Sequence, residues 1–198
     1  MCDGILWNTF IGGISMDFEV EILKYPTEED WMLCKICTLV TVGKNAIKPP
    51  DNEWKAKILK ANHSPIRTLN FCFRITNIPY WVVGHLVRHV HAVPFVKTQR
   101  TDRNKGHDRG ADRQDALVNM CWYMNAEELI TVGHKRLCGQ ASPETRQVVQ
   151  KICDMVVDVN PEFNGRFEPM CHYRGGICDE FECCGLNKKY KGGVIHVE

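Results

Sequence analysis

Residues Thr68 to Thr76 carry the most regular hydrophobic alternation in the chain, and they constrain its fold more than any other segment. One face of this stretch is apolar and carries Leu69, Phe71, Phe73 and Ile75. The other face is polar or small and carries Asn70, Cys72 and Arg74. A period of two residues is typical of a β-strand with one buried face. The segment therefore predicts a strand that covers a hydrophobic core.

The residues before this strand predict one further strand and two helices. Apolar and acidic residues alternate from Phe18 to Ile22, as in a half-buried strand. Thr27 precedes an acidic first turn and an apolar face at helical spacing, which predicts a capped helix that ends near Thr41. After a double proline, residues 53–61 predict a shorter helix.

A third helix is predicted to begin after Pro79 and to be broken by Pro94. It carries two histidines four residues apart and an arginine near its C-terminal end: His85, His89 and Arg88. Residues 95–100 then predict an extended segment, and residues 101–115 form a polar, charge-dense loop. Such loops are usually solvated or functional.

The second half of the chain predicts two more helices. Residues 116–137 are interpreted as one long helix, and Ser142 caps another that stops at residue 160. Asn125 and Arg136 are eleven residues apart, close to a whole number of turns, so both should share one face of the long helix. At roughly 16 Å apart, they could grip two ends of an elongated ligand or form an ordinary polar outer face.

The composition is that of a globular protein with one substantial core. Of the 198 residues, 44% are hydrophobic and 25% are charged, a balance that disordered and fibrous proteins do not have. We expect one folded domain over residues 16–168, followed by a small cysteine-rich tail over residues 169–198.

Charge and hydropathy exclude several classes of protein. A formal net charge of +1 argues against a nucleic-acid coat or a polybasic membrane surface, so we expect no nucleic-acid polymer as partner. No run approaches the roughly 18 apolar residues of a membrane span, and no signal-peptide pattern is present. We therefore expect a cytoplasmic protein whose eleven cysteines stay reduced or bind a metal.

Basic side chains are concentrated between Gly84 and Arg113. Guanidinium groups bind phosphate oxygens bidentately and stay charged, so this density favours a site for a nucleotide phosphate or pyrophosphate. Acidic residues are interleaved with the arginines at Asp102, Asp108 and Asp112, which leaves a solvated, salt-bridged loop as the alternative.

Two runs in this region resemble a known family. The run HSPIRTLNFCFRITNIPYWVVGHLVRHVHAVPFVKTQR and the later NAEELITVGHKRL are similar to flavin-dependent thymidylate synthases, whose signature is approximately RHRxxSxNExSxRY and whose later helix carries Asn-Ala and Leu-Arg. The resemblance spans roughly residues 60 to 157, about half of the chain. It looks closest to a shorter branch associated with phages and prophages.

The resemblance implies an α+β fold in which helices pack on a small central antiparallel sheet. It also implies reductive methylation of dUMP to dTMP, with FAD as cofactor, methylenetetrahydrofolate as one-carbon donor and NADPH as reductant. Members of the family are homotetramers with active sites at subunit interfaces. A phage-encoded protein would act in the cytoplasm of its bacterial host.

The resemblance assigns FAD contacts to several residues. Arg88 and His89 match the opening of the signature, and the helix positions Asn125 and Arg136 resemble flavin and nucleotide contacts. The following signature arginine is absent, and His91 or a neighbouring arginine could supply the lost positive charge.

The implied dUMP contacts follow in the extended segment. Thr98 stands where the signature has its second serine, Arg100 keeps the arginine two positions later, and Gln99 between them offers its backbone. An arginine from the following loop should also reach the nucleotide. Arg109 and Arg113 align equally well there, and Arg113 is slightly favoured.

Arg136 and His85 are the residues that we expect in the catalytic centre, and both are also expected to contact the substrate. Imidazole titrates near neutral pH, so His85 and His89 are candidates for proton handling, with a hydrogen-bonded structural histidine as the alternative. The family does not use a cysteine nucleophile, and none is assigned here.

The sequence departs from the signature at three positions. Val90 replaces an arginine, and Phe95 and Val96 replace an asparagine and a glutamate. The loss of a carboxylate at Val96 keeps two alternatives open. The protein could transfer another one-carbon group, such as a hydroxymethyl group, to a pyrimidine deoxynucleotide, or it could be a catalytically silent nucleotide-binding protein.

The C-terminal tail contains thiols in a glycine-rich segment too short for a core of its own. Thiolates favour tetrahedral zinc or an iron–sulfur cluster, and a metal could order such a tail. We expect Cys171, Cys178 and Cys183 as ligands, with Cys138 as the fourth because Cys183 and Cys184 are adjacent. Reduced, unliganded thiols are the alternative.

Overall fold

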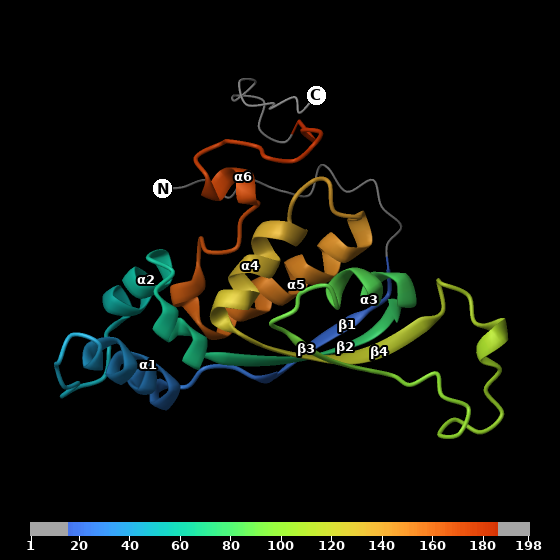
Figure 1. Cartoon of the computed structure of the whole chain (residues 1–198), viewed down its shortest axis with the longest axis horizontal. Helices are drawn as coiled ribbons and strands as arrows, with labels where there is room; N and C mark the ends of the chain where they lie inside the picture. Colours follow the sequence, from blue (N-terminus) through green and yellow to red (C-terminus); the bar gives the residue numbers. More distant parts are fainter. Residues whose placement is uncertain (1–15, 186–198) are drawn as a thin grey trace.

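The computed structural model describes residues 16–185 of the chain. Within this range, helices pack on a four-stranded antiparallel sheet, in agreement with the predicted α+β fold class (Figure 1). The sheet has the order β1-β2-β4-β3. The strands are β1 (Glu19–Lys24), β2 (Asn70–Pro79), β3 (Val93–Val96) and β4 (Leu117–Asn125).

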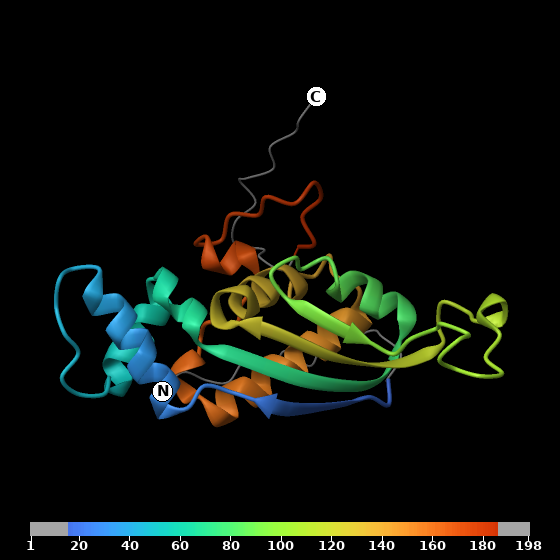
Figure 2. The same ribbon diagram turned by 60° about the horizontal axis from the view of Figure 1, so that its bottom comes forward.

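The helices of the described residues form two groups. α3 (Tyr80–Leu86), α4 (Ala126–Arg136) and α5 (Pro143–Val159) lie on one face of the sheet, and no other described element covers the opposite face (Figure 2). α1 (Glu28–Val40) and α2 (Asn52–Lys60) lie beyond one end of the sheet (Figure 1). The short elements are η2 (Ser64–Thr68), η3 (Arg109–Ala111), η4 (Pro161–Phe163) and α6 (Met170–Tyr173).

β2 is the centre of the core, as its alternation predicts. The apolar side chains from Leu69 to Ile75 are completely buried, and Phe73 lies opposite Ile22 of β1 and Trp122 of β4. The strand continues past the predicted end at Thr76 because its register shifts between Ile75 and Ile78. This irregularity lets three more residues join the sheet before α3 begins.

The predicted helix starts are confirmed where a capping residue marks them. The Thr27 hydroxyl accepts from the Asp30 amide, and the Asp30 carboxylate accepts from the Thr27 amide, which completes a capping box. Ser142 caps α5 through its hydroxyl, which accepts from the Thr145 amide, and Pro143 lies in the first turn. The two helices are therefore anchored by local chemistry.

The prediction of one long helix over residues 116–137 is wrong. The first half of that segment is β4, in which the apolar residues alternate and are buried: Val118, Met120, Trp122 and Met124. The second half is α4, and Asn125 is its N-cap, whose side-chain oxygen accepts from the Glu128 amide. Asn125 and Arg136 therefore mark the two ends of α4.

The third helix also ends earlier than predicted. α3 stops at Leu86, so Arg88 and His89 lie in the turns that follow it. Pro94, expected to break the helix, lies in β3. β3 pairs only with β4, and proline is tolerated in such an edge strand because its missing N–H faces no partner.

Candidate functional site

The C-terminal end of α4 gathers side chains from three parts of the chain. Arg136 donates from Nε to Nε2 of His89 at 2.9 Å and from Nη2 to the carbonyl oxygen of His85 at 2.6 Å. The turns after α3 are thus fixed to the last residue of α4. The structure thus brings Arg136 to two further predicted site residues, which lie 47 and 51 positions before it in the sequence.

His89 is neutral at physiological pH. Its side chain is 8% exposed, and burial, followed by the nearby Arg136 and Lys135 charges, lowers its pKa to about 4. Because Nε2 accepts from Arg136, the ring proton must lie on Nδ1. That atom faces Oε1 of Glu128 at 3.5 Å. His89 therefore links a cation to a carboxylate without carrying charge itself.

Glu128 is a buried carboxylate at the other end of this link. Burial raises its pKa, and His91 opposes that shift through its charge and through a backbone hydrogen bond. Sequence analysis did not identify Glu128. Its only signal was its position three residues after Asn125, which is typical of a residue near a helix start.

Arg136 and Arg88 form a local concentration of positive charge. Burial, then the charge of Arg88, lowers the pKa of Arg136, which nevertheless stays protonated as arginines in proteins do. The ion pairs of the described residues join neither arginine to a carboxylate. Two unneutralised guanidinium groups close together are suited to bind an anion.

His85 lies beside this charge on α3. Its Nδ1 is 3.1 Å from the hydroxyl of Thr145, which also accepts from the hydroxyl of Ser142 at 2.8 Å. Burial, then the charges of Arg136 and Arg88, lowers the pKa of His85. His85 is therefore half-buried and held in a hydrogen-bonded chain to the start of α5.

The N-terminal end of α4 borders a separate surface cavity of about 180 Å³. It is lined by Arg67, His91, Asn125, Glu127 and Glu128. Two predicted cofactor residues, His91 and Asn125, thus share one cavity. Arg67 forms a bidentate ion pair with Glu127 there, and neither residue was identified from the sequence.

Four of the predicted dUMP residues, namely Thr98, Gln99, Arg100 and Arg113, lie away from His85 and Arg136. Residues 97–115 extend beyond the end of the sheet, away from α4 (Figures 1 and 2). The Thr98 hydroxyl accepts from the backbone amide of Arg100, and the side-chain amide of Gln99 donates to the Asp112 carboxylate. Arg100 and Arg113 each pair with an aspartate two residues later. The structure does not bring these residues to Arg136 within one chain.

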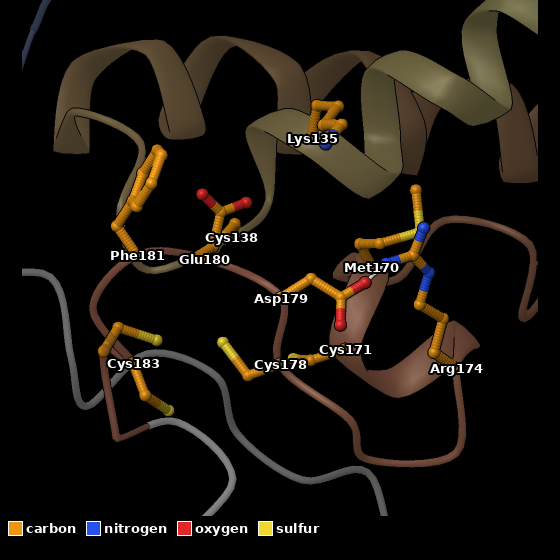
Figure 3. Close-up of a pocket in the computed structure, with 11 residues that line it drawn as sticks. Lys135, Cys138, Met170, Cys171, Arg174, Cys178, Asp179, Glu180, Phe181 and Cys183 are labelled. Atoms are coloured by element: carbon orange, nitrogen blue, oxygen red, sulfur yellow. Dashed lines mark ion pairs between the residues drawn. The ribbon is translucent and has the colours of Figure 1, made fainter. Parts of the chain in front are cut away.

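The tail thiols line a cavity of about 130 Å³ next to the end of α4 (Figure 3). Cys138, Cys171, Cys178 and Cys183, the four predicted ligands, all line it, together with Cys184. Within residues 16–185, no three His, Cys, Asp or Glu side chains are arranged as they stand to hold a metal ion. The metal and its ligands stay a prediction, and residues 186–198 of the tail lie outside the described residues.

None of the helices in residues 16–185 is long and apolar enough to span a bilayer.

Comparison with known proteins gives a structural likeness and no likeness in sequence. No protein-family model and no curated protein matches this chain. A crystal structure of thymidylate synthase X from Helicobacter pylori with FAD and dUMP matches 76% of this chain and 97% of its own, at 13% identity and a TM-score of 0.59.

A second crystal structure of the Helicobacter pylori flavin-dependent enzyme, also in complex with FAD and dUMP, matches 76% of this chain and 98% of its own. The identity is 16% and the TM-score is 0.61. The match covers nearly the whole of both Helicobacter chains, and it shows that this chain has the fold of these flavin-dependent thymidylate synthases.

Proposed function

We propose that the protein is a flavin-dependent thymidylate synthase-like enzyme that reductively methylates dUMP to dTMP, with methylenetetrahydrofolate as carbon donor. One observation carries the proposal: Arg136, anchored to His89 and His85, lies with Arg88 as an unneutralised cation pair on the fold of proteins that bind FAD and dUMP. NADPH would serve as the reductant. The branch associated with phages and the cytoplasmic location stay predictions.

The residues present fit part of FAD. Arg88 suits its pyrophosphate, and the cavity beside His91 and Asn125 offers polar groups for a ring edge. The cavity volume of about 180 Å³ is below the roughly 300–1,000 Å³ of sites that enclose a whole ligand. One chain would therefore hold only a portion of the dinucleotide. When bound, reduced FAD would supply the hydride that completes the methyl group.

Assembly into a homotetramer would complete the site. The loop of residues 97–115 points away from Arg136 in its own chain, so Thr98, Gln99, Arg100 and Arg113 would reach the nucleotide of another copy. The uncovered face of the sheet exposes apolar side chains of β3 and β4, namely Val93, Phe95 and Leu117. Such a face supports contact with further copies.

The histidines would have different tasks. His89, with its low pKa, holds Arg136 in place and stays neutral. His85 is half-buried and hydrogen-bonded to Thr145, so it is the better group to hold or move a proton beside the substrate. Arg136 would bind the substrate phosphate or a ring oxygen through its guanidinium edge.

A second candidate function is a catalytically silent nucleotide-binding protein. It is favoured by Val96 of β3, which pairs with Met120 of β4 and offers no carboxylate where the signature has one. Transfer of a hydroxymethyl group to the same nucleotide would fit the same anion site.

Mass spectrometry of the products separates these functions. The protein is loaded with FAD and incubated with dUMP, methylenetetrahydrofolate and NADPH. A product in which a methyl group replaces one hydrogen of dUMP supports the proposed function, and one in which a hydroxymethyl group replaces it supports the other transfer. Tight dUMP binding without any product would identify a binding protein.

A further inference from the structure

The guanidinium of Arg136 is held on one side by the hydrogen bonds that residues 16–185 provide. Nε donates to Nε2 of His89, and Nη2 donates to the carbonyl oxygen of His85. Both hydrogens of Nη1 and the second hydrogen of Nη2 remain to donate to a ligand. Such an edge can bind an oxyanion through two parallel hydrogen bonds. The direction of this edge is therefore set by the two acceptors that hold Arg136.

The charge of Arg88 opposes this arrangement. Arg88 is close enough to contribute to the lowered pKa of Arg136, with burial as the larger cause. Because the two cations repel each other, Arg136 needs an acceptor that keeps it near Arg88. A carboxylate in direct contact would also cancel the charge that attracts an anion. A neutral imidazole, as in His89, accepts the hydrogen bond and leaves that charge in place.

His89 can accept from Arg136 only while its ring proton lies on Nδ1. The ring packs edge-to-face against Trp122, with centroids 6.0 Å apart and an angle of 64° between the planes. This packing restricts the plane of the ring, but it does not decide which ring nitrogen carries the proton. The tautomer must be determined by a polar group beside the ring.

Glu128 lies beside the Nδ1 atom of His89. Its side chain is 7% exposed, and Oε1 is 3.5 Å from that nitrogen. This distance exceeds the roughly 2.7–3.2 Å of a direct N–H···O bond, so the carboxylate acts on the ring mainly through its charge. A negative charge beside Nδ1 favours the proton on that atom. The carboxylate also accepts from the backbone amide of His91, which fixes it to the turns that contain His89.

We propose that Glu128 is a positioning residue for the anion site. Its carboxylate keeps the proton of His89 on Nδ1, so that Nε2 accepts from Arg136 and the guanidinium presents a constant edge to the anion. The anion would be the phosphate of dUMP, so this role rests on the function proposed above. Glu128 acts on the phosphate through His89 and Arg136 and not by contact.

¹⁵N NMR of the neutral histidine rings tests the tautomer at pH 7 without any ligand. The signals of His89 are those that disappear in His89→Gln, and in the wild type they should show the proton on Nδ1. Glu128→Gln keeps the size of the side chain, removes its charge and can turn an N–H toward the ring. This variant should move the proton of His89 to Nε2 in part or completely.

Glu162→Gln is the matched control for this measurement. Glu162 has a carboxylate with the same exposure of 7%, but it lies near Lys55. Its replacement should leave the tautomer of His89 as in the wild type. A proton on Nε2 in the wild type would overturn the proposal, and this result needs no variant to fold. An unchanged tautomer in folded Glu128→Gln would overturn it as well.

Calorimetric titration with dUMP tests whether Glu128 acts through His89. Glu128→Gln is expected to weaken dUMP binding about three- to tenfold, because Arg136 keeps its charge and loses its fixed direction. In a His89→Gln protein the same substitution should have no further effect, since the ring through which Glu128 acts is missing. Equal losses in both backgrounds would contradict the proposed role.

Failure of the enzymatic proposal would give a different pattern. A wild-type protein that does not bind dUMP would contradict the proposed function. The NMR result would still decide whether Glu128 sets the tautomer of His89, because it needs neither dUMP nor FAD. Inorganic pyrophosphate would then replace dUMP as the anion in the same four titrations, with the same expected loss and the same contradicting result.

Discussion

The arginine at the end of α4 and the arginines of the 97–115 loop are all predicted nucleotide contacts, but they behave differently in the structure. Arg136 is half-buried and donates to groups that lie 47 and 51 residues away. Arg100 and Arg113 are exposed and pair with aspartates only two residues away. The first is held by the fold, whereas the other two are held by their own loop.

This difference determines what each arginine can do on binding a ligand. Local exposed pairs contribute little to stability because solvent screens them, so Arg100 and Arg113 can exchange an aspartate for a phosphate at small cost. Arg136 cannot move without leaving His89 and the His85 carbonyl without their donor. The comparison therefore predicts a preorganised contact at α4 and an adaptable one in the loop.

Replacement of Arg136 should have the largest effect. Arg136→Ala is expected to weaken dUMP binding about ten- to a hundred-fold, because a charge-assisted contact is lost. It should also lower the free energy of unfolding by about 1–3 kcal/mol, because a buried acceptor loses its partner. Calorimetric titration and denaturant unfolding measure both, with Lys135→Ala as the adjacent exposed control. Unchanged affinity in a folded variant would mean that the phosphate binds elsewhere.

Acid should destabilise the α4 site through His89. Its pKa of about 4 in the folded protein lies below the roughly 6.5 of an unfolded histidine, so the unfolded state binds the proton first. The stabilisation is complete above about pH 6.5 and is lost as the pH falls through 4, by about 3 kcal/mol at most. The buried Glu128, with its raised pKa, responds in the opposite direction.

Denaturant unfolding from pH 7 to 4.5 measures this loss. His89→Gln keeps an amide that can contact Arg136 but does not titrate, so its stability should fall less steeply with acid than that of the wild type. Parallel pH profiles for the two proteins would show that His89 is not the titrating group.

Loop substitutions should separate binding from stability. Arg100→Ala is expected to weaken dUMP binding about tenfold and to leave the unfolding midpoint unchanged. Uridine without its phosphate should respond far less. Arg113→Ala and Arg109→Ala, compared side by side, decide which loop arginine contacts the nucleotide. A lower unfolding midpoint for Arg100→Ala would show that this loop arginine also stabilises the fold, as Arg136 is expected to do.

The smallest effect is expected at Thr98. Its hydroxyl accepts from the Arg100 amide at 3.1 Å, which holds the backbone of the turn rather than a charge. Thr98→Ala should weaken dUMP binding about two- to fivefold, as loss of one neutral hydrogen bond does. Thr98→Ser keeps the hydroxyl and should bind as the wild type does. Equal weakening by both variants would assign the effect to the lost methyl group.

Local signals were enough to predict much of the fold. β2 follows from its alternation, and α1 and α5 follow from their caps. β4 was missed because it continues directly into α4, so the two elements read as one helix. The strand signal was the alternation of buried residues from Val118 to Met124. The cap signal of Asn125 with Glu128 marked the boundary between them.

The site was less accessible to sequence analysis. His85, His89 and Arg136 were identified as residues, but their contact depends on how α3 and α4 pack on the sheet, which no local pattern encodes. Arg67 and Glu127 were missed because an ion pair between residues 60 positions apart has no signature in the sequence. The loop arginines were identified by charge, yet charge alone could not indicate that they point away from α4.

The cap at the start of α4 also gives the oxygen and the nitrogen of the Asn125 side-chain amide different roles. The side-chain oxygen of Asn125 is committed to the Glu128 amide, so only its nitrogen remains to donate into the cavity that it lines. Aspartate caps helices about as well as asparagine but would present a second acceptor in place of that donor. Asn125→Asp should therefore keep the helix and reverse the polarity that the cavity shows to a ligand.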